Sequence, residues 1–285
     1  MSTSGKAKKT VNRTLLRVTG YEVRRKQPAK GGAAAPAAKK SPEPPPPAAT
    51  KSPAAKAPEK FPKDFDEQTV AIIRAVRPFT MTSPDKLHAL ISATRYVSRY
   101  GIEGDVVECG VWRGGSLHAV ARTLDSLDDH DRDLYLYDTF DGMNEPTDRD
   151  VRFDGKSAAG ELAAQDKDHS AVWAYASLED VQAGFADVPY PLDRVHFVKG
   201  PVEETVPGVL PERVSILRLD TDWYESTAHE LKHMYDRLVP GGVLLLDDYG
   251  WWQGSRVAVD EFLDRTGERL LLIRMGTGRI AVKAG

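Results

Sequence analysis

The sequence has a single cysteine, Cys109, in 285 residues. One cysteine excludes a disulfide within the chain, and such low usage is common in a reducing compartment. No apolar run reaches the ~20 residues that a transmembrane helix requires. The N-terminus also lacks the ~7–15-residue apolar segment of a signal peptide. From these absences we expect a soluble protein located in the cytoplasm.

Acidic and aromatic residues are scarce at the start of the chain. Residues 1–63 contain 15 Lys and Arg but three Glu, a net charge of +12, whereas the rest has a net charge of −15. Ten of the 19 prolines also fall in this part. Residues 27–63 have too few apolar side chains to offset the entropy lost on ordering. We therefore predict a basic tail over 1–26, a disordered, partly polyproline-like linker over 27–63 and a globular domain over 64–285.

The basic tail leaves two interpretations open. Its stretch "VNRTLLRVTGYEVRRK", residues 11–26, places apolar side chains among basic ones. Such a segment could form a short amphipathic helix that binds an anionic partner or a membrane surface. It could equally be a disordered tail. Nothing in it is similar to a module that reads nucleic acid, so we expect no specific nucleic-acid partner.

From residue 64 onward, apolar runs suited to strands alternate with stretches of helical spacing. The stretch that begins at Ser83 carries the signals of a helix start, with Ser83 as cap, Pro84 at the first position and Asp85 in the first turn. The near-continuous apolar strands predict an α/β fold with a mostly parallel sheet covered by helices on both faces. In such sheets ligands bind beyond the carboxyl ends of the strands.

A glycine-rich loop follows the first predicted strand, in "VVECGVWRGGS". Its spacing is neither the dinucleotide pattern nor a phosphate loop, because no Lys-Ser/Thr pair follows. Glu108, two residues before the first glycine, favours a cationic ligand over a pyrophosphate. Asp138 ends the next strand, where an acid usually holds ribose hydroxyls. A cationic nucleoside without phosphate indicates S-adenosylmethionine. The alternative is that the glycines, Gly110, Gly114 and Gly115, serve a tight turn alone.

Carboxylates end two later strands. Asp220 and Asp222 follow "VSILRL", and Asp247 and Asp248 follow "GGVLLL". Side chains alternate along a strand, so Asp220 and Asp222 share a face if the strand continues that far. Three carboxylates that meet at this edge would suit Mg²⁺, and a fourth could accept a proton from a coordinated hydroxyl. The alternative is that these residues cap the helices that follow.

The stretch "HELKH" matches the zinc-protease pattern H-E-x-x-H. His229 and His233 lie one helical turn apart. The helix leads directly into the strand that ends at Asp247, however, and no third ligand follows. We therefore expect exposed histidines on a crossover helix rather than a metalloprotease.

Five motifs resemble, in the same order, those of the macrocin O-methyltransferase family. The members of that family are metal-dependent sugar O-methyltransferases of antibiotic biosynthesis. The resemblance covers about 200 residues from Phe79 to the end, through "FTMTSPDKLHALISATRYV", "VVECGVWRGGS", "LYDTFDGM", "LRLDTDWYEST" and "GGVLLLDDY". It implies a Rossmann-like methyltransferase fold that uses S-adenosylmethionine and Mg²⁺. Residues 1–63 lie outside it.

The resemblance also implies roles for individual residues. The metal would be held by Asp220, Asp247 and Asp248, and Asp222 would be the general base. The cofactor site would be lined by Glu108, Gly110, Gly114, Ser116 and Asp138. The expected partner is a small-molecule acceptor that contains a sugar, and we expect a homo-oligomer. A catechol-type acceptor, or a non-catalytic binding protein on the same fold, remains the alternative.

Overall fold

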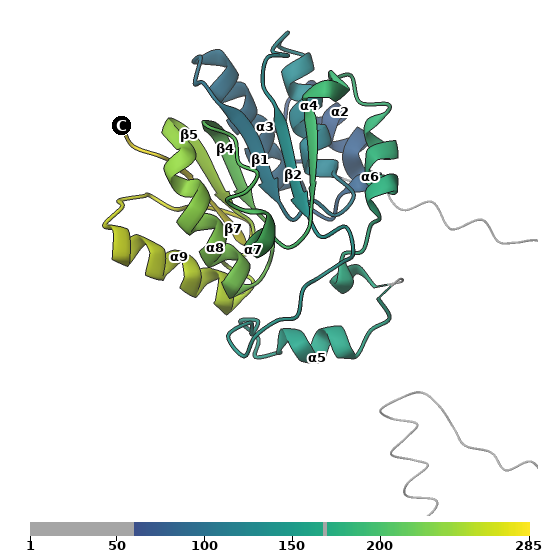
Figure 1. Ribbon diagram of the computed structural model, residues 1–285. Coiled ribbons are helices and arrows are strands. Elements are labelled where there is room, and N and C mark those ends of the chain that lie inside the picture. Colours follow the sequence, from purple (N-terminus) through teal and green to yellow (C-terminus); the bar gives the residue numbers. More distant parts are fainter. Residues whose placement is uncertain (1–59, 168–169) are drawn as a thin grey trace, which may run out of the picture. The chain divides into compact units, whose positions relative to one another are not determined.

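The computed structural model describes residues 60–167 and 170–285. The described residues belong to one compact unit, built around a seven-stranded sheet (Figure 1). The strands are β1 (Asp105–Cys109), β2 (Leu134–Asp138), β3 (Val195–Lys199), β4 (Val214–Leu219), β5 (Leu238–Leu246), β6 (Ile273–Met275) and β7 (Gly278–Val282).

The sheet has the strand order β3-β2-β1-β4-β5-β7-β6. Strands β1 to β5 pair in parallel, whereas β7 pairs antiparallel with both β5 and β6. The chain runs outward from β1 to β3 and then returns to place β4 on the other side of β1. The order therefore reverses between β1 and β4, which is where open α/β sheets bind their ligands. The prediction of a mostly parallel α/β sheet is confirmed.

Helices cover both faces of the sheet (Figure 1). One core cluster joins α3, α4 and α6 to the strands, and another joins α7, α8 and α9 to the opposite face. A further small cluster holds α2 against α3 and α4. The helices are α2 (Glu67–Val76), α3 (Pro84–Arg99), α4 (Gly115–Asp125), α5 (Ala158–Ala163), α6 (Leu178–Phe185), α7 (Val202–Thr205), α8 (Tyr224–Met234) and α9 (Gln253–Thr266), with 3₁₀ turns η1 (Arg77–Phe79), η2 (Ala171–Trp173), η3 (Leu192–Arg194) and η4 (Tyr235–Arg237).

The start of α3 follows from its sequence. The Ser83 hydroxyl accepts a hydrogen bond from the Lys86 backbone N–H, and Pro84 takes the first helical position. The buried residues of α3 recur at helical spacing, so one face packs against the sheet and α4 while the other is exposed. This packing fixes the first turn of α3 beside the carboxyl ends of the strands.

Some boundaries differ from those that the sequence pattern suggests. The predicted helix "AHELKHMYDRLV" ends at Met234, and after η4 the chain already enters β5 at Leu238. Helices α5, α6 and α7 are not apparent in the pattern because they are six, eight and four residues long. Segments this short give little helical periodicity. The segment that holds α5 extends away from the sheet (Figure 1).

The predicted tail and nearly all of the predicted linker lie outside the described residues. Phe61, which we assigned to the linker, packs against the α2 cluster, with its ring centroid 6.3 Å from that of Phe65. The boundary at residue 64 stays a prediction. Within residues 60–167 and 170–285, no helix is both long enough and apolar enough to cross a membrane.

Candidate active site

The loops after β1 and β4 touch at the point where the strand order reverses. Gly110 directly follows β1 and has φ +80°. A Cβ at Gly110 would lie 2.1 Å from the Asp220 carbonyl oxygen, so no larger residue fits there. The Asp220 backbone N–H also donates to the Cys109 carbonyl, at 2.9 Å. The glycine loop and the first aspartate are therefore parts of one wall.

A cavity of about 950 Å³ opens at this edge of the sheet. Its volume lies at the upper end of the ~300–1,000 Å³ typical of small-molecule sites. It is lined on one side by the loops after β1 and β2 and on another by the segment before α6. Of the predicted site residues, six line this cavity: Gly110, Asp138, Asp220, Asp222, Asp247 and Asp248.

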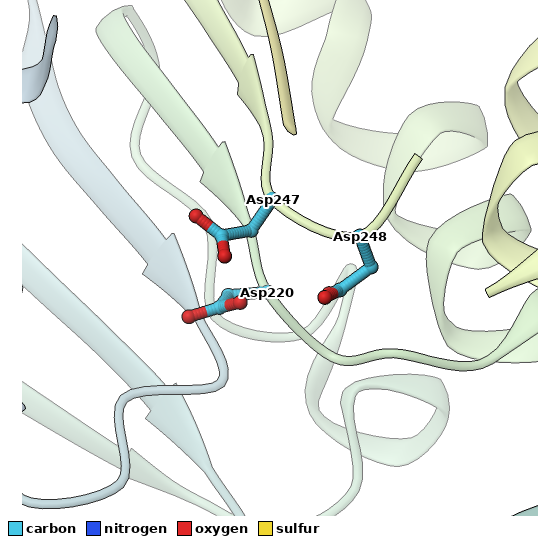
Figure 2. A group of neighbouring side chains, drawn as sticks. All are labelled: Asp220, Asp247 and Asp248. Atoms are coloured by element: carbon cyan, nitrogen blue, oxygen red, sulfur yellow. The ribbon is translucent and has the colours of Figure 1, made fainter. Parts of the chain in front are cut away.

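Three carboxylates that line the cavity lie close to one another (Figure 2). Asp220 follows β4, and Asp247 and Asp248 follow β5. One oxygen from each of the three lies within 4.8 Å of the others. Among the described residues this is the one such group of three possible ligands. An all-oxygen set that faces a cavity fits a hard divalent ion such as Mg²⁺, which keeps positions open for water or substrate oxygens.

Arg218 neutralises part of the negative charge of this acidic cluster. It lies on β4, is 2% exposed and forms a buried ion pair with Glu108 on β1. Its Nη2 also lies 2.8 Å from Asp220 Oδ2 and 2.7 Å from Asp247 Oδ1. A buried guanidinium with several carboxylate partners is held firmly, because removal of any partner would leave a buried charge unpaired.

Lys86 supplies a second cation from the first turn of α3. Its ammonium forms an ion pair with Asp247 Oδ2 and donates to the Asp247 carbonyl oxygen at 2.9 Å. Burial alone would lower the pKa of Lys86, but Asp247, Asp248 and Asp220 raise it above its ordinary value. The side chain therefore stays charged and cannot serve as the proton acceptor of a reaction.

The four aspartates have different proton affinities. Burial raises the pKa of Asp220 and of Asp248 well above the ordinary value, although Lys86 acts in the opposite direction on both. For Asp247 burial is outweighed by Arg218 and Lys86, which lower its pKa to about 2. Burial and the charge of Asp220 raise the pKa of Asp222 to about 7. Asp247 is therefore the permanently charged member of the group.

Asp222 does not reach the cavity by strand alternation. Strand β4 ends at Leu219, and Asp222 adopts a left-handed conformation with φ +67°. Its backbone N–H donates to Asp248 Oδ2 at 3.2 Å, and its Oδ1 accepts the Trp252 indole N–H at 2.7 Å. A tight turn held from two sides therefore returns Asp222 to the wall that also carries Asp220.

Asp138 joins two loops. Its Oδ2 accepts the backbone N–H groups of Val111 and Trp112, at 2.8 and 3.0 Å. Its Oδ1 accepts the backbone N–H of Phe140 at 2.8 Å. Asp138 thus fixes the glycine loop to the loop after β2, and most of its acceptor capacity is used inside the protein. Its contact with ribose hydroxyls stays a prediction.

The other predicted cofactor residues lie behind the cavity wall. Glu108 is 1% exposed and Ser116 is 4% exposed. Burial raises the pKa of Glu108 to about 7, although Arg218 acts to lower it. Gly114 caps the start of α4 in a left-handed conformation. None of the three lines the cavity. Their part in cofactor binding stays a prediction, because in the structure they lie behind the residues that line the cavity.

The histidines of "HELKH" do not share a site with the glutamate between them. His229 and His233 are half-buried, so our expectation of exposed histidines is wrong. Their rings are tilted by 41° with centroids 4.4 Å apart, and His229 Nε2 lies 2.9 Å from the Val206 carbonyl oxygen. Glu230 points the other way, is fully buried and accepts the Thr221 hydroxyl at 3.0 Å. In a zinc protease the two histidines bind the ion and the glutamate acts as the base beside it, so a buried Glu230 does not support a zinc-protease site.

Three residues of the site were not predicted from the sequence. Arg218 had a detectable signal, because a charge inside the apolar run "VSILRLD" requires a buried partner. Trp252 follows the paired aspartates closely, but its sequence position does not reveal that it faces Asp222. Lys86 gave no signal, since it lies 161 residues from Asp247 and sits in an ordinary amphipathic helix.

Solved structures with this fold include methyltransferases. The O-methyltransferase NovP matches with a TM-score of 0.63 and 28% identity, over 73% of this chain and 83% of that one. The calicheamicin methyltransferase CalS11 matches with a TM-score of 0.51 and 17% identity, over 76% of this chain and 91% of that one, which supports the fold alone. The fold and the cavity define a Rossmann-like O-methyltransferase.

Sequence comparison identifies the family. The model of Macrocin-O-methyltransferase (TylF) matches residues 47–274. Mycinamicin III 3''-O-methyltransferase of Micromonospora griseorubida is 35% identical over 188 residues, which are 66% of this chain and 71% of that protein. An O-methyltransferase of Streptomyces olivaceus, which acts at the 4' position of a rhamnosyl-tetracenomycin, is also 35% identical, over 66% of this chain and 69% of that one. The chain belongs to the macrocin O-methyltransferase family, and the resemblance inferred from the motifs is confirmed. The match begins at residue 47, within the part that we placed outside the resemblance, and ends at residue 274 rather than at the end of the chain.

Proposed function

We propose that this protein transfers a methyl group from S-adenosylmethionine to a hydroxyl group of a sugar in a glycosylated natural product, and that it uses Mg²⁺. The support for the acceptor class is that the relatives from Micromonospora griseorubida and Streptomyces olivaceus are named for glycosylated compounds.

The observation that carries the proposal is the group of carboxylates beside the glycine loop. Asp220, Asp247 and Asp248 offer oxygen ligands within 4.8 Å of one another, and Asp222 lines the same cavity. The donor set fits Mg²⁺. The cavity also joins the loop at Gly110, where a cofactor would bind, to the carboxylates, where an acceptor hydroxyl would bind.

The chemistry can be divided between bound groups and protein residues. When bound, S-adenosylmethionine supplies an electrophilic methyl group, and Mg²⁺ lowers the pKa of a coordinated hydroxyl. Asp222 accepts the proton of the acceptor hydroxyl at Oδ2, because its Oδ1 already accepts the Trp252 indole N–H. Without a bound ion the pKa of Asp222 is about 7, within the range of bases that work near neutral pH. The cavity walls hold the two substrates in line, which supplies much of the rate enhancement.

The test is methyl transfer by the full chain to a panel of acceptors, with S-adenosylhomocysteine as the measured product. The panel holds glycosylated macrolides, a rhamnosylated polyketide, and catechol as the rival acceptor. We expect transfer to a glycosylated compound with Mg²⁺, loss of transfer in excess chelator and recovery on adding Mg²⁺ back. Full activity in chelator would contradict the metal requirement, and transfer to catechol alone would contradict the acceptor class.

Further expectations from the sequence remain proposals. They are a homo-oligomeric assembly, a cytoplasmic location, and an anionic partner for the basic tail over 1–26. The direct cofactor contacts of Glu108, Gly114, Ser116 and Asp138 belong with them. Binding of S-adenosylmethionine to variants at these positions, measured by calorimetry, would test the cofactor contacts one by one.

A further inference from the structure

Asp247 has a cation on each of its carboxylate oxygens. Oδ1 lies 2.7 Å from Arg218 Nη2, and Oδ2 is paired with the Lys86 ammonium. Asp247 is 7% exposed, so little solvent shares in compensating its charge. A ligand carboxylate that is already paired with two cations binds a third one less readily, because like charges repel strongly in a partly buried site.

The two cations differ in how freely they can move. Arg218 is 2% exposed and is bound by carboxylates from three segments, so it cannot leave without exposing buried charges. Lys86 has 11% of its side chain exposed, and it lines the cavity. Within the described residues, Asp247 is its one ion-pair partner. Its four-carbon stem allows the ammonium to swing toward the solvent.

The position of Lys86 in its helix is itself unfavourable. It occupies the first turn of α3, where the helix dipole disfavours a positive charge. The neighbouring Asp85 does not bind it, and the compensation comes from Asp247, 161 residues along the chain. The lysine is therefore held in place by the aspartate cluster, and it depends on that cluster for its charge balance.

We propose that the Lys86 ammonium is the resident counter-cation of the three-aspartate cluster, which holds Asp247 while no divalent ion is bound and gives way when the ion enters. Arg218 is the permanent cation of the site, and Lys86 is the exchangeable one. The inference rests on the proposed metal site and adds to it a residue that sets the affinity for the ion. Lys86 is a positioning residue in this account, because it acts through Asp247.

Two consequences follow for the protein without substrates. First, divalent ions compete with an internal cation, so removal of the lysine charge should tighten their binding. Second, without a divalent ion the lysine limits repulsion among the aspartates. A variant without this charge should therefore gain more thermal stability from the divalent ion than the wild type gains.

The experiment measures Mn²⁺ binding to the full chain by electron paramagnetic resonance and calorimetry, with melting temperatures recorded with and without the ion. The variants are Lys86→Met and Lys86→Gln, which remove the charge, and Lys86→Arg, which keeps it. Lys232→Met is the matched control, because Lys232 is an exposed lysine on α8 that does not line the cavity. Neither readout requires turnover.

We expect Lys86→Met and Lys86→Gln to bind Mn²⁺ about tenfold or more tightly than the wild type, since one repelling charge is removed at close range. Lys86→Arg and Lys232→Met should bind as the wild type does. Equal or weaker binding by both neutral variants, with clear binding by the wild type, would overturn the role of Lys86 and leave the metal site intact. No binding by any of these proteins would overturn both.

Discussion

The Trp252 indole N–H donates to Asp222 Oδ1 over 2.7 Å, and this bond joins the start of α9 to the turn after β4. Trp252 is 4% exposed and packs edge-on against Trp223, with ring centroids 5.0 Å apart. The proposed base therefore has one oxygen fixed by a rigid donor, and its residue lines the cavity.

Substitution of Trp252 by Phe removes the donor and keeps most of the apolar contact. We expect kcat to fall by about 10- to 100-fold, which is the effect of about 1.4–2.7 kcal/mol lost at the base. The Kd for S-adenosylmethionine should not change. Trp251→Phe is the matched control, because Trp251 lines the same cavity and is 42% exposed. An equal loss of kcat in both variants would show that the hydrogen bond from Trp252 to Asp222 does not contribute to the reaction rate.

Glu230 supports the same turn from the opposite side. It is fully buried on α8 and accepts the Thr221 hydroxyl at 3.0 Å. Burial raises its pKa well above the ordinary value, which favours the neutral acid. Glu230→Gln keeps the acceptor and the shape, and we expect its free energy of unfolding to stay within about 0.5 kcal/mol of the wild type at pH 7.

Glu230→Ala should cost about 2–4 kcal/mol, because it leaves a buried space and removes the acceptor of Thr221. Urea unfolding of the two variants measures both values. If Glu230→Gln were destabilised as much as Glu230→Ala, the carboxylate charge would be required in the fold and the neutral state inferred from burial would be wrong.

The buried imidazole of His118 makes the free energy of unfolding depend on pH. Its ring lies between Phe79 and Phe185, with centroids 4.8 and 4.2 Å away, and it is 1% exposed. Burial and the nearby Arg122 lower the pKa of His118 from 6.5 to about 4. Between these values the unfolded chain binds a proton that the folded chain does not. The contribution of His118 to the free energy of unfolding therefore falls as the pH falls from about 6.5 to about 4.

His118→Leu should remove this contribution. The difference in free energy of unfolding between wild type and variant should change by about 2–3 kcal/mol over that pH range, to the disadvantage of the wild type at low pH. His130→Leu, at a partly exposed histidine, is the control for the loss of a histidine side chain. A difference between wild type and His118→Leu that is constant from pH 7 to pH 4 would contradict a neutral, buried imidazole.

Much of the sheet could be predicted because its strands are nearly continuous apolar runs. The same runs placed Asp220 and Asp247 at strand ends, and parallel strands bring their carboxyl ends to one edge. Asp222 reached the predicted place for a different reason, a left-handed turn that no alternation rule contains. Lys86 and Trp252 depend on which helix faces which loop, and that is decided by the packing of the whole chain.

The start of the folded domain can be tested by truncation. Phe61 packs on the α2 cluster, and the Arg74 guanidinium lies 5.5 Å from its ring centroid. A chain that begins at Lys60 should keep the melting temperature and turnover of the full chain, whereas one that begins at Asp64 should lose about 1–2 kcal/mol of stability with that ring. Both should lose salt-sensitive binding to anionic vesicles, if the basic tail has that partner.

A large fall in turnover or melting temperature for the chain that begins at Lys60 would contradict this division. The preceding residues would then belong to the catalytic fold. The family match begins at residue 47, inside the predicted linker, which makes the comparison of the two starting points informative.

The central claim is that the aspartates after β4 and β5 form one divalent metal site with a separate base beside it. The most direct measurement is the stoichiometry of Mn²⁺ bound to the full chain and to its Asp→Asn variants, followed by electron paramagnetic resonance. We predict one ion per wild-type chain, loss of that ion in Asp220→Asn and Asp248→Asn, and retention in Asp222→Asn because Asp222 lies outside the group of ligands. An ion that survives in Asp220→Asn and Asp248→Asn but is lost in Asp222→Asn would contradict the account.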